Sequence, residues 1–389
     1  MPTVNRFAEL ADEITEWRRD IHANPELQYD VHRTAALVAE KLTAFGLDEV
    51  VPGIGRTGVV GVIRGRSNAS GKVVGLRADM DALPIEEATG KPYASTVPGK
   101  MHACGHDGHT AMLLGAAKYL SETRNFDGTV VVIFQPAEEG GAGAKAMIDD
   151  GMMERFGIQE VYGMHNMPGA PVGTFAIRPG ALMAAADRIT IDIEGKGCHA
   201  AKPHEGIDTI LVGSQIVNAL QSIASRNTDP LESMVVSITM FNAGFTDNVI
   251  PQQARLRGTV RTLVPELRDM AEERIRRIVE LTAEAYGATA TLHYSRDYPV
   301  TVNNAEKAAF AASVAASIVG EANVETNVPP TMGGEDFSFM LEARPGAFIF
   351  AGNGDSASLH HPAYDFNDDL IPVGCSYWVK LVETAMPAA

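Results

Sequence analysis

The stretch Thr129-Val-Val-Val-Ile-Phe-Gln-Pro-Ala-Glu-Glu-Gly-Gly141 joins a short apolar run to a polar turn. The apolar part, residues 129–134, has the length and the β-branched content of a fully buried strand. Pro136 ends that strand because proline has no N–H to donate, and the two glycines allow a tight turn behind the acids. The stretch therefore predicts a buried sheet with carboxylates delivered at one of its edges.

The chain on both sides of this run alternates between strand and helix patterns. Strands are predicted at 59–63, 72–78 and 159–163, and helices at 7–21, 34–45, 109–121 and 144–156. This rhythm predicts an α/β domain, in which a mixed sheet carries helices on both faces.

A second unit is predicted between residues 187 and 295. Its order is strand, helix, strand, strand, helix, strand, at 188–194, 209–225, 234–241, 254–262, 265–286 and 288–294. This order resembles a ferredoxin-like α+β insertion. Helices at 305–319 and 375–386 and a strand at 346–352 follow it, so residues 1–186 and 296–389 are expected to form one discontinuous catalytic domain.

Composition narrows the possible functions. With 45% hydrophobic and 21% charged residues, the 389-residue chain is expected to be globular and large enough for more than one domain. Its net charge of −17 opposes binding to nucleic acid and to anionic membranes. No apolar run approaches the roughly 20 residues of a membrane span, and the N-terminus lacks a secretion signal. Three well-separated cysteines fit a reducing compartment, so a cytoplasmic location is expected.

The run Met101-His-Ala-Cys-Gly-His-Asp-Gly-His109 concentrates metal-ligand chemistry. A single histidine here would be read as an ordinary residue at a helix start, but one thiol and three imidazoles within nine residues indicate a divalent ion. Zn²⁺, Mn²⁺, Co²⁺ and Ni²⁺ all accept these ligands.

Two further polar motifs, Arg77-Ala-Asp-Met-Asp81 and Met164-His-Asn166, are expected to begin where strands end, as residues 135–139 do. Ligands of open α/β sheets bind at the carboxyl ends of strands. The three motifs should therefore bring carboxylates and an imidazole to one rim. A solvated acidic turn is the alternative for Glu138 and Glu139, but a buried strand in front of them and two glycines behind favour a role in the site.

Six motifs together resemble the hippurate hydrolase type of N-acyl-amino-acid amidohydrolase, one of the dinuclear metallopeptidases that include aminoacylase and carboxypeptidase G. The motifs lie in the same order along nearly the whole chain, at residues 77–84, 101–109, 135–140, 197–200, 248–251 and 333–337. The resemblance implies a small-molecule N-acyl amino acid as substrate and two divalent metal ions per subunit, of Zn, Mn, Ni or Co. It also implies a homodimer, or a higher homo-oligomer, formed through the inserted domain.

The resemblance implies a role for individual residues of the metal centre. Cys104 would bridge the two ions, Glu138 would be the general base, and Asp81 would orient a ligand or the base. The other implied ligands are His106, Glu139, His165 and His360, with His361 left as an alternative to His360.

Two neighbours of these ligands are expected to support the site. His109 would lie behind the ligands. Asp79 stands where the wider superfamily has a histidine ligand, and a structural role is favoured over metal contact.

The inserted domain would contribute groups that bind the substrate. His199 and Asn248 would polarise the scissile carbonyl and hold the oxyanion. Arg255 would bind the substrate carboxylate, with Arg257 and Arg261 as competitors.

Other functions stay open at this point. The same ligands could serve a dipeptidase, a carboxypeptidase or another C–N hydrolase, since substrate choice depends on pocket walls. A non-catalytic metal-binding protein is disfavoured because neither the base nor a ligand is missing. Redox use of Cys104 is disfavoured because no second thiol lies at Cys-x-x-Cys spacing.

Overall fold

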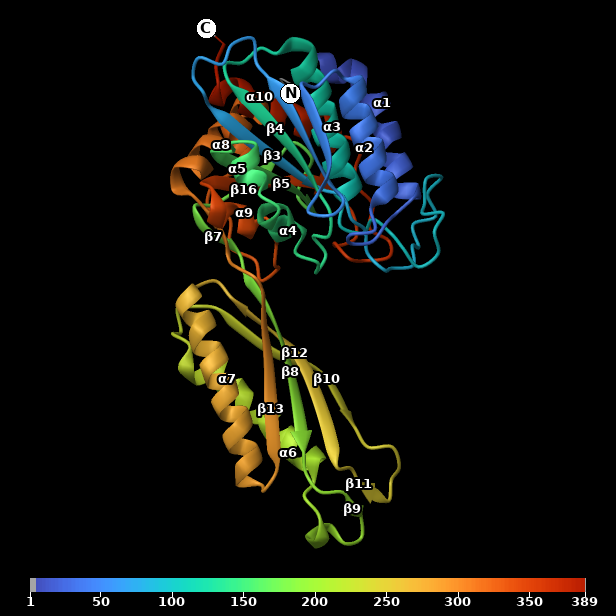
Figure 1. The fold of residues 1–389 in the computed structure, drawn as a ribbon, viewed down its shortest axis with the longest axis vertical. Helices are drawn as coiled ribbons and strands as arrows, with labels where there is room; N and C mark the ends of the chain where they lie inside the picture. The colour runs from blue at the N-terminus through green and yellow to red at the C-terminus, as the bar shows by residue number, and fades with distance from the viewer. Residues whose placement is uncertain (1–4, 389) are drawn as a thin grey trace. The chain divides into compact units, whose positions relative to one another are not determined.

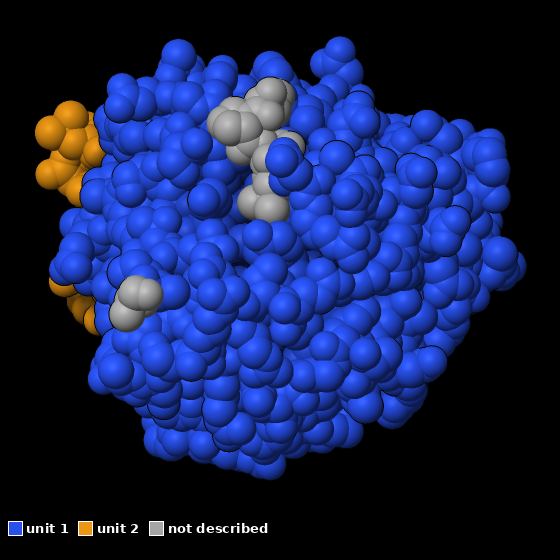
Figure 2. All heavy atoms as spheres, turned by 90° about the horizontal axis from the view of Figure 1, so that it is seen from above, with its two compact units in different colours: residues 1–182, 302–329, 336–389 blue, residues 183–301, 330–335 orange. Residues whose placement is uncertain are grey.

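The computed structural model describes residues 5–388, which divide into two compact units. The larger unit holds the described residues up to Leu182, Val302–Pro329, and those from Asp336 on. The smaller unit holds Met183–Thr301 and Pro330–Glu335, and Figure 2 colours the two separately. No helix within residues 5–388 is long and apolar enough to cross a membrane.

The smaller unit differs from the predicted insertion at 187–295. It begins at Met183, extends to Thr301, and takes in Pro330–Glu335, which the sequence assigned to the catalytic domain. Two backbone hydrogen bonds join the segment 330–335 to the start of this unit. The N–H of Ala184 lies 3.1 Å from the carbonyl oxygen of Thr331 and 2.9 Å from that of Gly333. Contacts so distant in sequence leave no periodic signal.

The larger unit is built on an eight-stranded mixed sheet, as predicted (Figure 1). The pairs β3–β4, β3–β5 and β5–β16 are parallel, whereas β1–β2, β2–β4 and β6–β16 are antiparallel. In sheet order the strands are β1 (Glu49–Ile54), β2 (Gly58–Arg64), β4 (Thr129–Gln135), β3 (Val73–Asp79), β5 (Glu160–Pro168), β16 (Gly346–Gly354), β6 (Phe175–Ala176) and β15 (Val324–Glu325).

Helices cover both faces of this sheet. Alternate residues of each strand point to opposite faces of the sheet. On one face, side chains such as Leu76 of β3 and Val132 of β4 share a core with residues of five long helices. On the other face, Gly58 lies against Met147 of a short helix. The five long helices are α1 (Asn5–Ala23), α2 (His32–Ala44), α3 (His106–Thr123), α8 (Ala305–Val319) and α10 (Leu370–Ala385); the short ones are α4 (Gly143–Asp149), α5 (Met152–Arg155) and α9 (Ser338–Ala343).

Two local predictions were wrong. His165 was expected after a strand that ends near Gly163, but β5 continues to Pro168 because β16 pairs with it in parallel from Val161 to Pro168. The helix predicted at 144–156 is broken into α4 and α5, because Gly151 takes a left-handed φ of 80° between them.

The smaller unit is an antiparallel sheet covered by two helices, in the predicted order. Ile189, Ile191 and Ile193 alternate along β8 and face α6 (Thr209–Ser222) and α7 (Pro265–Ala285) in a separate core. In sheet order the strands are β10 (Met234–Ala243), β12 (Gln253–Thr262), β8 (Ala185–Glu194) and β13 (Thr289–Tyr298). Two short pairs complete the chain: β9 (Cys198–His199) with β11 (Val249–Ile250), and β7 (Gly180–Met183) with β14 (Thr301–Asn303).

Candidate metal centre

Metal-ligand side chains from four segments of the larger unit meet beyond β4, around the end of β5. The ligand atoms of Cys104, His106 and His165 lie within 4.8 Å of one another, and so do those of Cys104, Glu139 and His360. Because Cys104 belongs to both groups, its sulfur is the atom that the two groups share. A shared thiolate between two sets of imidazole and carboxylate donors suits a pair of divalent cations.

A glycine turn presents Cys104 and His106 side by side at the start of α3. Gly105 between them has φ 90°, and a Cβ there would lie 2.2 Å from Nδ2 of Asn166 and 2.6 Å from the hydroxyl of Tyr364. Only glycine fits this close approach. The position thus fixes the spacing of the two ligands.

The two ligand histidines are held in the same tautomer. Nδ1 of His106 donates to the backbone carbonyl of Asp81 at 2.8 Å, and Nδ1 of His165 donates to the carbonyl of Asn166 at 2.7 Å. Their Nε2 atoms are therefore the free ring nitrogens, and that of His165 lies 3.4 Å from Sγ of Cys104. Nε2 of His106 is buried without a hydrogen bond to any residue in 5–388, and the buried Oε1 of Glu139 lies 3.3 Å from Nε2 of His360. A buried ring nitrogen without a hydrogen bond, close to a carboxylate and a second imidazole, fits a bound cation.

His109 lies behind the ligands rather than among them. Its Nδ1 donates to Oδ1 of Asp79 at 2.7 Å, and its Nε2 accepts the backbone N–H of Asn166 at 3.0 Å. Both ring nitrogens are thus used by protein groups. Asp79 also accepts from Arg77 at 2.7 Å, and its hydrogen bond with His109 ties β3 to α3. Burial would raise the pKa of Asp79, but Arg77 and His106 hold it well below its usual value.

Asp81 holds the acidic turn in place. Its two carboxylate oxygens accept the backbone N–H groups of Glu138 and Glu139, each at 3.0 Å. Ala137 and Ala142, on either side of the turn, both have φ 55°, a left-handed value that is rare for residues other than glycine. Strained backbone of this kind persists only where the surroundings enforce it. The turn is therefore a rigid, pre-formed support for two carboxylates.

Without a cation, the site holds protons. Burial raises the pKa of the Cys104 thiol well above its usual value, and the neighbouring carboxylates Glu139 and Glu138 add to the rise. Burial lowers the pKa of His106, but Asp79 and Asp81 outweigh it and raise that pKa to about 10. Metal ligands bind in their deprotonated forms, so cations would displace these protons.

The adjacent histidines His360 and His361 are separated by the structure. His360 has φ 64°, its N–H donates to the carbonyl of Ala103 at 2.8 Å, and its Nε2 lies 3.3 Å from Oε1 of Glu139. His361 is exposed, as His360 is, but its Nδ1 accepts the N–H of Ala363 at 3.0 Å. The geometry favours His360 as the ligand.

His199 and Asn248 come together in the smaller unit. β9 and β11 pair there, and the N–H of Ala200 donates to the carbonyl of Asn248 at 3.0 Å. Both side chains are exposed. Nδ1 of His199 accepts the N–H of Ala201, so the proton of the neutral ring lies on Nε2, which can act as a donor.

The three arginines of β12 differ in their surroundings. Arg255 is exposed and pairs with Asp192, its cross-strand partner, at 2.5 Å, and Arg257 is also exposed. Arg261 is half-buried beside Gly334, and its guanidinium has no hydrogen bond or ion pair with any residue in 5–388. Burial lowers the pKa of Arg261.

Sequence reasoning missed Asn166 as a part of the site. Its amide donates to the carbonyl of Cys104 at 2.6 Å and accepts the hydroxyl of Tyr364 at 2.7 Å. The only signal in the sequence is its place directly after His165. Asn166 fixes the backbone of the shared ligand.

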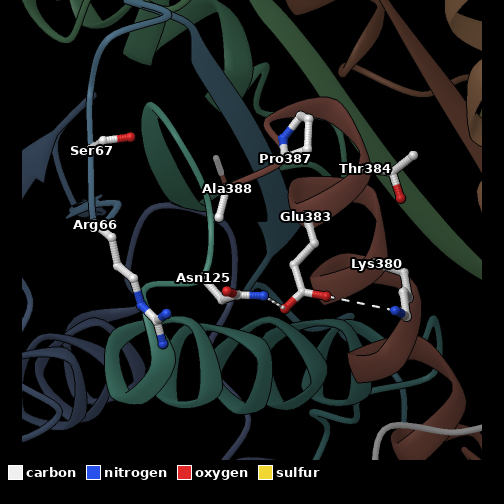
Figure 3. Close-up of a pocket in the computed structure, with 8 residues that line it drawn as sticks. All are labelled: Arg66, Ser67, Asn125, Lys380, Glu383, Thr384, Pro387 and Ala388. Carbon is white, nitrogen blue, oxygen red and sulfur yellow. Dashed lines mark hydrogen bonds and ion pairs between the residues drawn. The ribbon is translucent and has the colours of Figure 1, made fainter.

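A surface pocket of the larger unit lies elsewhere (Figure 3). It borders the start of β4, where the N–H of Asp127 donates to the carbonyl of Met386 at 3.0 Å, whereas the ligands follow the end of β4. Its Lys380 and Glu383 form an ion pair at 3.7 Å, and none of the predicted ligands lines it. The lining residues are Arg66, Ser67, Asn125, Lys380, Glu383, Thr384, Pro387 and Ala388.

The chain resembles known proteins along nearly its whole length. The family model described as "Peptidase family M20/M25/M40" matches residues 75–384. The hippurate hydrolase of Campylobacter jejuni subsp. jejuni is 46% identical over 381 residues, covering 98% of each chain. Thermostable carboxypeptidase 2 of Saccharolobus solfataricus is 43% identical, covering 95% of this chain and 94% of its own. The crystal structure of the Bacillus subtilis YXEP protein, described as a dinuclear metal binding peptidase from the M20 family, has a TM-score of 0.84 at 36% identity. It covers 98% of this chain and 100% of that chain.

Proposed function

Since this chain belongs to peptidase family M20/M25/M40, we propose that it is a metal-dependent amidohydrolase, which cleaves N-acyl amino acids into a carboxylic acid and a free amino acid. The observation that carries the proposal is the cluster itself, in which Cys104 is shared by two ligand groups next to the buried Glu138. The hippurate hydrolase relative supports an acyl amino acid as the substrate class.

The metal ions would be held by Cys104, His106, Glu139, His165 and His360, which together offer one thiolate, one carboxylate and three imidazoles. When bound, two divalent ions lower the pKa of water and polarise the amide carbonyl. The ions are Zn, Mn, Ni or Co, which all accept this donor set. The sparse, widely spaced cysteines support a cytoplasmic location.

The acidic residues would have two different roles, proton transfer and positioning of the turn. Glu138, whose carboxylate lies within 4.8 Å of the ligand atoms of His106 and Glu139, takes a proton from the attacking water and passes it to the leaving nitrogen. Asp81 keeps Glu138 and Glu139 in register through their backbone N–H groups. His199 and Asn248 donate to the carbonyl oxygen as negative charge develops on it.

One arginine of β12 would bind the carboxylate of the amino acid. The sequence favoured Arg255, but its guanidinium is already engaged by Asp192. The guanidinium of Arg261 has no hydrogen-bond or ion-pair partner within residues 5–388, and it is partly buried. Partial burial strengthens a bidentate bond to a carboxylate. We therefore assign the substrate carboxylate to Arg261.

A substrate panel tests this assignment together with the proposed function. Metal-free protein reloaded with Mn²⁺, Co²⁺, Ni²⁺ or Zn²⁺ is assayed on N-benzoyl and N-acetyl amino acids and on peptides. The peptides are included because one relative is named a carboxypeptidase. Arg261→Leu should raise KM by about 10- to 100-fold, the loss of one charged hydrogen-bonding group, and Arg255→Leu much less. No turnover of any acyl amino acid with any of the metals would refute the function. A larger rise of KM in Arg255→Leu than in Arg261→Leu would instead assign the substrate carboxylate to Arg255.

The smaller unit would form the homodimer. β10 is an edge strand, and its Met240 and Phe241 are 45% and 40% exposed. The ring of Phe241 lies over Gly213 of α6, next to Ile210 and Leu211, which are 43% and 47% exposed. An unpaired strand edge flanked by exposed apolar residues is suited to pairing with a second copy.

Light scattering after size exclusion tests the dimer. Wild-type protein should run at twice the 41.5 kDa of one chain, and Phe241→Lys should shift it toward the monomer. Leu231→Lys is the matched control, because Leu231 is 95% exposed but lies outside β10 and α6. A monomeric wild type, or equal dissociation by both variants, would contradict the proposed interface.

A further inference from the structure

The short segment between α1 and α2 contacts the acidic turn of the metal centre. We infer that this segment, Glu26–Tyr29, is a strap that positions the turn 138–141, and that Gln28 and Tyr29 are its positioning residues. The inference rests on the proposed function, because it assigns the strap to the turn that carries Glu138 and Glu139. None of the six motifs identified in the sequence includes these residues.

Two side chains of the strap bind the backbone of the turn. Nε2 of Gln28 donates to the carbonyl of Glu139 at 2.9 Å, and the hydroxyl of Tyr29 donates to the carbonyl of Gly141 at 2.7 Å. A Cβ on Gly141 would lie 3.3 Å from the Tyr29 ring and only 2.7 Å from Cβ of Ala137. The strap therefore binds carbonyl groups of the turn, whereas Asp81 binds its N–H groups.

The strap is itself anchored at both ends. The carbonyl of Glu26 accepts the N–H of Ala82 at 2.8 Å, directly after Asp81. The carboxylate of Glu26 accepts the N–H groups of Arg33 and Thr34 at 2.9 and 2.8 Å, and so caps α2. The hydroxyl of Thr57 donates to the carbonyl of Tyr29 at 2.9 Å. These anchors mean that the strap can restrain the turn rather than follow it.

Backbone strain indicates that Gln28 is more than a linker residue. Gln28 has φ 48°, a left-handed value that glycine would adopt at no steric cost. Glutamine at such a position is disfavoured unless its side chain is needed. Here the side chain makes one contact, with the carbonyl of the predicted ligand Glu139. Ala137, Ala142 and His360, in the same centre, share left-handed φ values.

The decisive variant removes the strap contacts without harming the fold. In Gln28→Gly combined with Tyr29→Phe, glycine relieves the strained φ and phenylalanine keeps the ring that Arg56 covers at 4.0 Å. The metal-free variant should unfold at the wild-type temperature or slightly above it. Its affinity for the second of two Mn²⁺ equivalents, measured by competition with a chromogenic chelator, should fall by about 10- to 100-fold.

Kinetics with saturating metal separate positioning from substrate binding. The double variant should show a lower kcat with KM unchanged, because Gln28 and Tyr29 bind the backbone of the turn that carries the proposed base. Asp30→Ala is the matched control: Asp30 is exposed, two residues beyond Gln28, and its carboxylate has no hydrogen bond or ion pair within residues 5–388. It should keep wild-type metal affinity and kcat.

The outcomes are distinguishable from failure of the proposed function. Wild-type Mn²⁺ affinity in a folded double variant would overturn the strap, whatever the enzyme hydrolyses. Weakened Mn²⁺ binding in a protein that turns over no acyl amino acid would keep the strap and overturn the function. If the double variant unfolds early, Gln28→Gly alone provides the same metal-binding test.

Discussion

Replacing Glu138 with glutamine is expected to leave both metal ions bound and to lower kcat by about 10²- to 10⁴-fold, the usual contribution of a general base. Glutamine has the same size, and the backbone N–H of residue 138 would still donate to Asp81 at 3.0 Å. The carboxamide cannot accept a proton from water at neutral pH. The turn therefore survives while its proton acceptor is lost.

Metal content by mass spectrometry and kcat on the best substrate of the panel measure this result. Glu342→Gln is the control for a lost surface carboxylate, because Glu342 is exposed on α9. Wild-type turnover in the Glu138 variant would remove this residue as the base. Loss of one metal equivalent would instead place Glu138 among the ligands.

Secondary structure was predictable where one periodic pattern decided it. The apolar spacing in residues 305–319 and the β-branched run from Thr129 gave α8 and β4 with close to their observed bounds. Prediction failed where a distant segment decided the outcome. The extension of β5 through His165 depends on pairing with β16, nearly two hundred residues later in the chain. Gly151 breaks a helix whose apolar pattern continues across it.

The candidate site divides in the same way. The grouping of Cys104 with histidines could be predicted, because a thiol and imidazoles at close spacing are rare in a chain with three cysteines. Partners across the sheet could not be predicted: Asp192 occupies Arg255 because β8 and β12 place them opposite each other. The tautomers of His106 and His165 depend on carbonyl groups, which sequence does not distinguish. Gln28 is missed for the same reason, since it binds only backbone.

Replacing Cys104 with alanine is expected to abolish binding of both metal ions and to lower kcat/KM by at least about 10³-fold, or about 4 kcal/mol of transition-state stabilisation. The reason is that Sγ of Cys104 belongs to both ligand groups. Loss of any other ligand would leave one group intact. Loss of the sulfur also leaves Glu139 and the imidazoles without the negative charge that offsets repulsion between two dications.

Chelation of the wild type should reproduce this loss, and added Mn²⁺, Co²⁺, Ni²⁺ or Zn²⁺ should restore activity to the wild type but not to Cys104→Ala. Cys375→Ala is the matched control, because Cys375 is also buried and its thiol donates to the carbonyl of Met112 at 3.2 Å, away from every ligand group. It should unfold at a lower temperature, as expected for a lost core atom, yet bind two ions. Two tightly bound ions in Cys104→Ala would contradict the shared role of the sulfur. Each ion would then be held by its own set of ligands, without Cys104.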